Sequence, residues 1–266
     1  MGAGVRLSTL RPLWIVIYVC VPAHNESRTI GVLLWKVRKV LGEFDRAYRV
    51  VVHEDGSTDD TAEVLARYSR SLPLTVLRSD KRLGYAASVD RLLRYVVNDA
   101  PYPKRDCAVV LQGDFTEDPQ DLVGLVKVLE GGADIVAGCA TDSSGPVPRS
   151  VRLIGRLSRL ALGKVLDDSP VSDPLNGFRA YRVIVLKKAF RDRPESEPLV
   201  SSEGWAANLE LLGALAPHAR RIGEAPLDRR YEFRPRPSRL RPWRTLRALA
   251  RLRGGSWWSE LDAGAA

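Results

Sequence analysis

The chain has 266 residues, of which 45% are hydrophobic and 27% are charged. This composition is that of a globular protein with a sizeable core, and it excludes a disordered or low-complexity chain. The formal net charge of +9 favours anionic partners such as nucleotide phosphates, nucleic acid or an acidic membrane surface, although solubility alone also accounts for such an excess.

The predicted elements alternate along the first half of the chain between short apolar runs and amphipathic stretches with helical spacing. Strands are expected at 14–21, 49–53, 74–77, 107–111 and 134–137, and helices at 30–41, 59–68, 85–97 and 119–129. In the second half, helices are expected at 150–166, 205–216 and 243–253, and strands at 178–181 and 222–227. The alternation predicts a doubly wound, mostly parallel α/β sheet with helices on both faces.

The domain organisation follows from the same pattern. Residues 1–12 are expected to form a loose leader, residues 13–230 one α/β domain, and residues 231–266 a basic C-terminal extension. In that extension, residues 239–253 combine arginines with leucines at helical spacing, which predicts a basic amphipathic helix. Such a helix suits an anionic membrane interface, and packing onto the main domain explains it equally well.

The cysteines and the N-terminal apolar run bear on the compartment. Cys20, Cys107 and Cys139 are scattered and form no CxxC pair, so we predict small core residues in a reducing cytoplasm rather than disulfides or a zinc site. Residues 13–21 are apolar over only about half of a bilayer span and lack a small-residue cleavage site, so we predict neither a spanning helix nor a signal peptide.

Acidic residues recur directly after three predicted strands. Glu26 follows the first strand, Asp55 the second and Asp114 the fourth. Ligands of such sheets bind beyond the carboxyl ends of the strands, so one shared site is expected there. Caps and turns explain the Ser, Gly and Asn residues of these loops, but they explain repeated carboxylates less well, because like charges repel without a cation or ligand.

Two of these loops carry a family resemblance. Residues 21–26 read Val-Pro-Ala-His-Asn-Glu and residues 54–61 read Glu-Asp-Gly-Ser-Thr-Asp-Asp-Thr, and together they resemble family 2 glycosyltransferases of the GT-A fold. The likeness continues at 84–88 and at 173–181, where Asp-Pro-Leu-Asn-Gly-Phe-Arg-Ala-Tyr is most similar to the dolichol-phosphate mannosyltransferases. The resemblance implies a GT-A domain over residues 13–230 and an inverting transfer of a hexose from a nucleotide diphosphate sugar.

The resemblance also implies which residues meet the nucleotide. These are Pro22, Ala23, Glu26, Asp55 and Gly84. A carboxylate at a strand exit can accept hydrogen bonds from a base N–H or from ribose hydroxyls, and Gly56 lets the backbone approach a ligand closely. The alternatives are an Asx turn for Asp55 and a helix first-turn acid for Glu26.

The metal motif departs from the family pattern. The family has Asp-x-Asp after the fourth strand, whereas residues 112–116 read Gln-Gly-Asp-Phe-Thr. We expect Asp114 to be the catalytic metal and diphosphate ligand, with neutral oxygens from Gln112 and Thr116, holding Mg²⁺ or Mn²⁺ more weakly than a complete motif. A metal-independent enzyme that uses arginine, or a non-catalytic protein, are the alternatives.

The acceptor is expected to be a polyprenyl or dolichyl phosphate. A phosphomonoester is already an anionic nucleophile, so it needs cations rather than a general base. Candidates that could guide the phosphate are Arg149, Arg152 and Arg156 on the predicted helix, and Arg179, which lies inside the family block and is also a catalytic candidate. A solvated cationic helix face is the alternative for the helix arginines.

The remaining implied features complete the prediction. Ser238 and Arg239 resemble a closing loop that reaches the phosphates, although Pro237 replaces the usual glycine. GDP-mannose is the first donor expected and a UDP-hexose is the second. An anionic membrane surface is expected as a further partner, and nucleic acid is not. The expected location is the cytoplasm, peripheral on the inner face of the membrane. A sugar or protein hydroxyl acceptor with Glu203 as base, and a non-catalytic nucleotide-sugar or membrane-binding protein, are the competing hypotheses.

Overall fold

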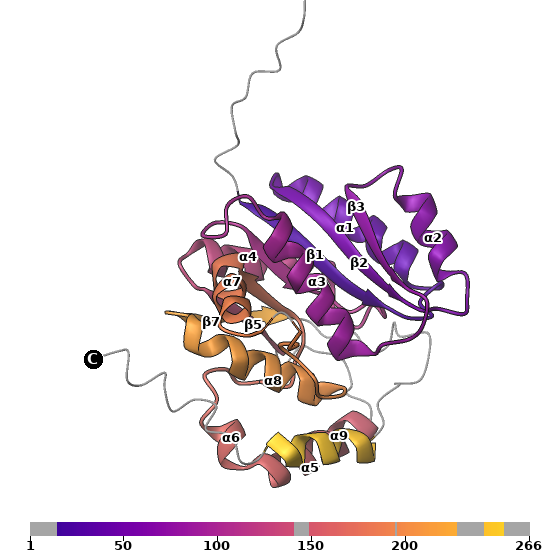
Figure 1. Cartoon of the computed structure of the whole chain (residues 1–266). Helices are drawn as coiled ribbons and strands as arrows, with labels where there is room; N and C mark the ends of the chain where they lie inside the picture. The colour runs from indigo at the N-terminus through magenta and orange to yellow at the C-terminus, as the bar shows by residue number, and fades with distance from the viewer. Residues whose placement is uncertain (1–14, 141–148, 195, 228–241, 253–266) are drawn as a thin grey trace, which may run out of the picture.

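A computed structural model describes residues 15–140, 149–194, 196–227 and 242–252. Their strands form one seven-stranded sheet in the order β3-β2-β1-β4-β6-β5-β7 (Figure 1). The strands are β1 (Val16–Ala23), β2 (Ala47–Asp55), β3 (Leu74–Ser79), β4 (Cys107–Val110), β5 (Ile135–Ala140), β6 (Arg179–Arg182) and β7 (Ile222–Leu227). Only β6 runs against its neighbours, since it is antiparallel to both β4 and β5 while the other pairs are parallel. The predicted mostly parallel sheet is confirmed.

Helices cover both faces of the sheet, as predicted. The helices α1 (Ile30–Phe44), α2 (Thr61–Tyr68) and α4 (Leu122–Glu130) pack on one face, and α3 (Tyr85–Asp99), α7 (Val183–Arg191) and α8 (Trp205–Leu215) pack on the other (Figure 1). Successive side chains of a strand point to opposite faces, so Ile17 and Val19 join one core while Tyr18 and Cys20 join the other. A strand buried on both sides reads as an uninterrupted apolar run, which is why β1 was visible in the sequence.

Two elements differ from the prediction. Helix α7 was not expected, because its first residues Val-Ile-Val are β-branched and have the composition of a strand. It forms as a helix whose buried face is Val183, Val185, Leu186 and Ala189. The helix predicted at 150–166 is divided into α5 (Arg149–Leu162) and α6 (Lys164–Asp167), because Gly163 between them has a φ of +35° and interrupts the helical backbone.

The C-terminal helix packs on the domain. Helix α9 (Pro242–Arg251) contacts α5 and α8, and Leu249 is fully buried in the core beside α8 (Figure 1). In the part of the chain that the structure describes, every helix is too short or too polar to cross a bilayer. The predicted leader at 1–12 and the predicted closing loop with Ser238 and Arg239 lie outside the described residues.

Candidate nucleotide-sugar site

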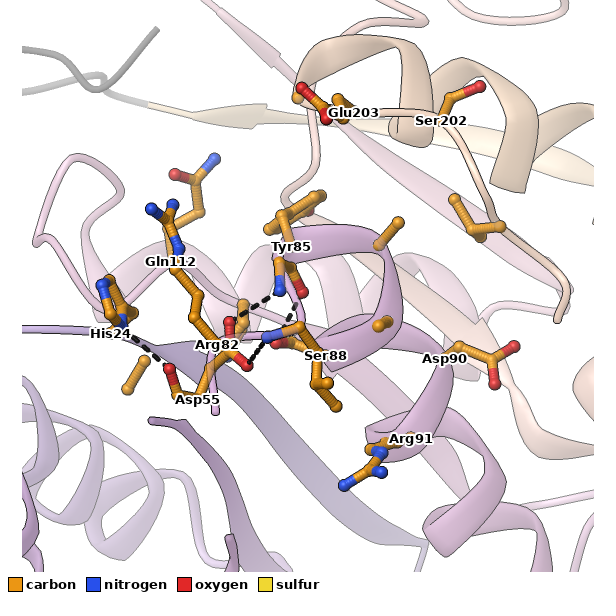
Figure 2. Close-up of a pocket in the computed structure, with 18 of the residues that line it drawn as sticks. His24, Asp55, Arg82, Tyr85, Ser88, Asp90, Arg91, Gln112, Ser202 and Glu203 are labelled. Atoms are coloured by element: carbon orange, nitrogen blue, oxygen red, sulfur yellow. Dashed lines mark hydrogen bonds between the residues drawn. The ribbon is translucent and has the colours of Figure 1, made fainter. Parts of the chain in front are cut away.

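One large pocket lies beyond the carboxyl ends of β1, β2 and β4. Its volume is about 920 Å³. The loops that follow these strands form one wall, and the start of α3 together with residues 198–205 before α8 forms the other. Figure 2 shows Ser202 and Glu203 across the opening from His24 and Asp55. The β6 strand runs in the opposite direction, so its carboxyl end lies away from this edge of the sheet.

The pocket gathers the predicted nucleotide-binding residues and most of the predicted metal ligands. All five predicted nucleotide-binding residues and two of the three predicted metal ligands line it, namely Pro22, Ala23, Glu26, Asp55, Gly84, Gln112 and Asp114. These residues come from segments up to about 90 positions apart in the chain, and the parallel strands bring them to one edge. The predicted convergence of Glu26, Asp55 and Asp114 is therefore present in the fold, and the role of each residue stays a prediction.

Asp55 fixes the backbone of the loop that leads into α3. Its side chain is 3% exposed, and its two oxygens accept hydrogen bonds from the backbone N–H groups of Leu83 at 2.6 Å and Gly84 at 2.9 Å (Figure 2). The Asx turn that was the alternative role for Asp55 is not formed by these hydrogen bonds. Instead Glu54 receives the local hydrogen bond, from the Ser57 N–H at 2.6 Å. The carboxylate of Asp55 thus ties the end of β2 to the next strand–helix loop.

Gly56 lets this loop come close. Its φ is +58°, and a Cβ added there would lie 2.7 Å from the backbone nitrogen of Arg82 and 2.7 Å from the carbonyl carbon of Lys81. Backbone atoms cannot move aside as a flexible side chain can, and a positive φ is itself unfavourable for other residues. Asp55 and Gly56 together therefore hold residues 81–84 against the end of β2.

The two family loops are hydrogen-bonded to each other. The Asn25 Oδ1 atom accepts the Thr58 N–H at 2.7 Å, and the Glu26 N–H donates to the Thr61 hydroxyl at 2.7 Å. Glu26 is 6% exposed, and one of its carboxylate oxygens accepts a bond from the Thr29 hydroxyl at 3.2 Å. The polar residues of the second loop thus position the first, which explains physically why the two sequence patterns occur together.

Asp114 is the carboxylate of the predicted metal motif that faces the pocket. It is 3% exposed and its Oδ1 accepts hydrogen bonds from the Thr116 N–H at 3.2 Å and the Thr116 hydroxyl at 2.6 Å. Thr116 does not line the pocket and its two hydrogen bonds orient Asp114, so its role as a metal ligand stays a prediction. Gln112 does line the pocket, and its backbone N–H donates to Glu117 at 3.3 Å.

The pocket offers few carboxylates to a divalent ion. Within the described ranges, from 15–140 to 242–252, no three His, Cys, Asp or Glu side chains are grouped so as to hold a metal. The carboxylate of Asp118 forms an ion pair with Lys36 at 2.7 Å and does not line the pocket. A set of Asp114, the Gln112 amide oxygen and substrate phosphates fits Mg²⁺, which is commonly held by one or two carboxylates together with phosphate oxygens.

The model of the family named Glycosyl transferase family 2 matches residues 18–190, about two thirds of the chain and the whole of this pocket except its α8 side. The chain belongs to this family. The sheet with its single antiparallel strand is the GT-A fold.

Curated relatives of this family 2 member act on lipid phosphates, by their names. The dolichol-phosphate mannosyltransferase of Pyrococcus furiosus is 28% identical over 176 residues, which is 64% of this chain and 47% of that protein. The undecaprenyl-phosphate 4-deoxy-4-formamido-L-arabinose transferase of Edwardsiella ictaluri is 26% identical over 174 residues, 64% of this chain and 50% of that protein. The chain therefore spans about half the length of these relatives.

Solved structures show the same fold. The glucosyl-3-phosphoglycerate synthase of Mycobacterium tuberculosis, crystallised with Mn²⁺, UDP and glucosyl-3-phosphoglycerate, superposes with a TM-score of 0.59 at 21% identity, covering 94% of this chain and 80% of that one. TarS residues 1–349 of S. aureus in complex with UDP superposes with a TM-score of 0.53 at 22% identity, covering 79% and 57%.

The structure corrects the prediction that Arg179 guides the acceptor. In this family 2 member its side chain is 0% exposed and does not line the pocket. Its guanidinium donates to the backbone carbonyls of Asn208 at 2.6 Å and Pro174 at 2.5 Å. Arg179 therefore joins the turn before β6 to α8. Membership of a family block indicated that the residue matters, but it did not indicate on which side of β6 the side chain lies.

The helix arginines are also away from the pocket. Arg152 and Arg156 are exposed on α5, which packs with α9 (Figure 1), and neither lines the pocket; the side chain of Arg149 lies outside the described part. Arg152 and Arg156 therefore do not face this pocket, and their contact with an acceptor phosphate stays a prediction. Arg152 and Arg156 lie on an outer surface of the molecule.

The sequence did not indicate which residues support the second wall of the pocket, nor that Arg82 lines it. The wall at residues 198–205 is held by Asp90, which accepts the Leu199 N–H at 2.7 Å, and by Glu210, which accepts the N–H groups of Ser201 at 3.0 Å and Ser202 at 2.7 Å. Arg82 also lines the pocket. The signal for it was a basic pair just before the Gly84 motif, and only the fold shows which of the two cations faces the cavity.

Proposed function

We propose that this protein transfers a hexose from a nucleotide diphosphate sugar to a polyprenyl phosphate, with inversion at the anomeric carbon. The observation that carries the proposal is the convergence of Glu26, Asp55 and Asp114 on one pocket at the carboxyl edge of a GT-A sheet. GDP-mannose is the first donor, because the relative from Pyrococcus furiosus is a mannosyltransferase by name, and a UDP-hexose is the second.

The donor fits the pocket by size and by polarity. A volume of about 920 Å³ is at the upper end of the roughly 300–1,000 Å³ usual for small-molecule sites, as a nucleotide sugar requires. The first turn of α3, which lines the pocket at Tyr85 and Ala86, carries no acidic residue, so its backbone N–H groups favour an anion. In this arrangement the nucleoside lies by Glu26 and Asp55 and the diphosphate by Asp114.

The divalent ion belongs with Asp114. Asp114 would hold Mg²⁺ or Mn²⁺, and the ion would supply positive charge to the diphosphate leaving group. Thr116 keeps the Asp114 carboxylate in place through two hydrogen bonds, and Gln112 adds a neutral oxygen. The chain's own contribution is thus a single oriented carboxylate, which is the reason to expect weak metal affinity.

The acceptor assignment rests on the relatives and on the chemistry of phosphate. A phosphate oxygen attacks without a general base, so the pocket needs no group to remove a proton from it. A lipid acceptor also requires contact with a membrane. The α5 and α9 helices, which contact each other, supply a suitable surface. Leu153 and Leu160 on α5 are 57% and 80% exposed, and exposed arginines lie on the same two helices, namely Arg152, Arg156, Arg247 and Arg251. We therefore propose that the protein binds peripherally to the membrane, on its cytoplasmic face.

A second candidate is transfer to a hydroxyl group. Glu203 is exposed and lines the pocket opposite Asp55 (Figure 2), where a carboxylate can take the proton of an attacking hydroxyl. Asp90 and Glu210 accept hydrogen bonds from the backbone of the segment before α8, and this segment carries Glu203. The position of Glu203 in the pocket is the reason to include a hydroxyl acceptor in the experiment.

The test is transfer of label from radioactive GDP-mannose or UDP-glucose to polyprenyl phosphate, with Mn²⁺ and with EDTA. Organic-extractable label supports the proposal, and Asp114→Asn is expected to lower the rate by about 100-fold because the metal loses its carboxylate. Glu203→Gln is expected to leave the rate within about threefold, since no base is needed. Label found only on a hydroxyl acceptor, with loss of activity in Glu203→Gln, supports the second candidate. Donor binding without any turnover indicates a non-catalytic protein.

A further inference from the structure

We infer that Arg82 binds the diphosphate of the donor and that this contact allows a nucleoside diphosphate to bind when no divalent ion is present. The inference rests on the proposed function and extends it, because it assigns a role to a residue outside the metal motif. It concerns the very place where this chain departs from the Asp-x-Asp pattern.

Arg82 presents a cation to the pocket. Its side chain is exposed and lines the pocket, and Figure 2 shows it extending between His24 and Tyr85 towards Gln112. No ion pair joins it to any carboxylate in the part of the chain that the structure describes. A guanidinium that faces a cavity and is not neutralised there favours an anionic ligand, and its planar donors match phosphate oxygens in bidentate fashion.

The loop that carries Arg82 is fixed. Asp55 accepts hydrogen bonds from the two residues that follow Arg82, and Gly56 allows the Lys81–Arg82 backbone to lie against the end of β2. The base of the Arg82 side chain is therefore set by buried hydrogen bonds. A cation held by a rigid loop loses less conformational entropy on binding than one on a free segment.

The neutral Gln112 side chain explains why the diphosphate needs the Arg82 guanidinium and why that guanidinium is free of a carboxylate at position 112. A second carboxylate at position 112 would help to hold a divalent ion and would also attract the Arg82 guanidinium. The neutral amide does neither, so Asp114 is the one motif carboxylate that lines the pocket. With weak metal binding, a fixed guanidinium supplies part of the positive charge that the diphosphate requires.

The experiment measures dissociation constants of GDP and UDP by titration calorimetry, in Mn²⁺ and in EDTA, for the wild-type chain and three variants. Arg82→Gln removes the charge, Arg82→Lys keeps it without the planar fork, and Lys81→Gln removes the neighbouring exposed cation that does not line the pocket. In EDTA, Arg82→Gln is expected to weaken GDP or UDP binding by about tenfold or more, Arg82→Lys by less, and Lys81→Gln by less than twofold.

Guanosine and uridine separate a diphosphate contact from a base contact. Their affinities are expected to be the same in Arg82→Gln and the wild type. Equal weakening of nucleoside and nucleotide in Arg82→Gln overturns the inference, and so does an unchanged affinity for GDP and UDP. A wild type that binds nucleoside diphosphate only with Mn²⁺ also overturns it while leaving the proposed function intact. A wild type that binds neither nucleotide under any condition refutes both.

Discussion

The carboxylate of Asp55 lies 2.6 Å from the backbone nitrogen of Leu83 and 2.9 Å from that of Gly84, so an acid at the end of β2 holds the loop that begins α3. In a family 2 glycosyltransferase this acid is expected to meet the nucleotide. The structure adds that it also builds the wall of the pocket, because both of its oxygens are already engaged by that loop.

Replacement of this acid by its amide tests the structural role. Asp55→Asn leaves one oxygen to accept one N–H and turns an NH₂ group towards the other, so a buried donor loses its partner. We expect a loss of about 2 kcal/mol in the free energy of unfolding, together with weaker GDP and UDP binding. Urea unfolding measures the first effect. Asp60→Asn is the matched control, since Asp60 belongs to the same acidic loop but is exposed and makes no capping hydrogen bond, and a similar loss there would contradict the prediction.

A pair of glycine substitutions tests the close approach at Gly56. Gly56→Ala forces a Cβ against backbone atoms of residues 81 and 82 at a φ of +58°, so we expect destabilisation of about 2 kcal/mol or more and displacement of the loop. Gly42→Ala lies inside α1 with no atom within 4 Å of its added Cβ, and should stabilise the protein by about 0.5–1 kcal/mol. Thermal or urea unfolding measures the stability of the two variants. An equal change in the free energy of unfolding in both would refute the assignment of close packing to Gly56.

The buried His53 predicts a pH dependence of stability. Burial lowers the pKa of His53 below its usual value of 6.5, and its ring nitrogens hydrogen-bond to Ser88 and Ser79 at 2.9 Å. The unfolded chain then binds more protons than the folded one below about pH 6.5, so the stabilisation is present above that pH and is lost as the pH falls towards the folded pKa.

The measurement is the free energy of unfolding in urea at several values between about pH 5.5 and 7.5. A single group contributes a slope of at most about 1.4 kcal/mol per pH unit. His53→Gln should show a shallower slope than the wild type in this window, whatever its absolute stability. His218, whose pKa burial also lowers, is present in both proteins and cancels in the comparison. Parallel curves for the two proteins would mean that His53 does not titrate in this window.

Thiol labelling tests the burial of the cysteines. Cys20 and Cys107 are buried, and burial raises the pKa of both thiols, whereas Cys139 at the end of β5 is half-buried and lies 3.0 Å from the Ser172 hydroxyl. A maleimide should therefore modify one thiol in the folded protein at about pH 7.5 and all three in urea. Cys139→Ser should remove the native reaction. Mass spectrometry counts the adducts, and fast labelling of a second cysteine would show that the sheet opens.

Much of the fold was predictable because its signals are local. Strands such as β1 and β2 are short apolar runs between polar loops, and α1 and α3 repeat apolar residues at helical spacing. The helix α7 was missed because β-branched residues favour strands locally, whereas packing on β6 and α8 favours the helix. The strand order and the reversal of β6 also depend on contacts between distant segments.

The sequence by itself determined which loops carry the acids and glycines, because motif spacing and turn chemistry are properties of neighbouring residues. Only the tertiary structure decided where each side chain acts. Arg179 is buried beneath α8 and Thr116 supports Asp114, while Arg82 faces the pocket. The physical reason is that a side chain's partners are set by strands and loops that lie far away along the chain, and the packing of the sheet brings these into contact.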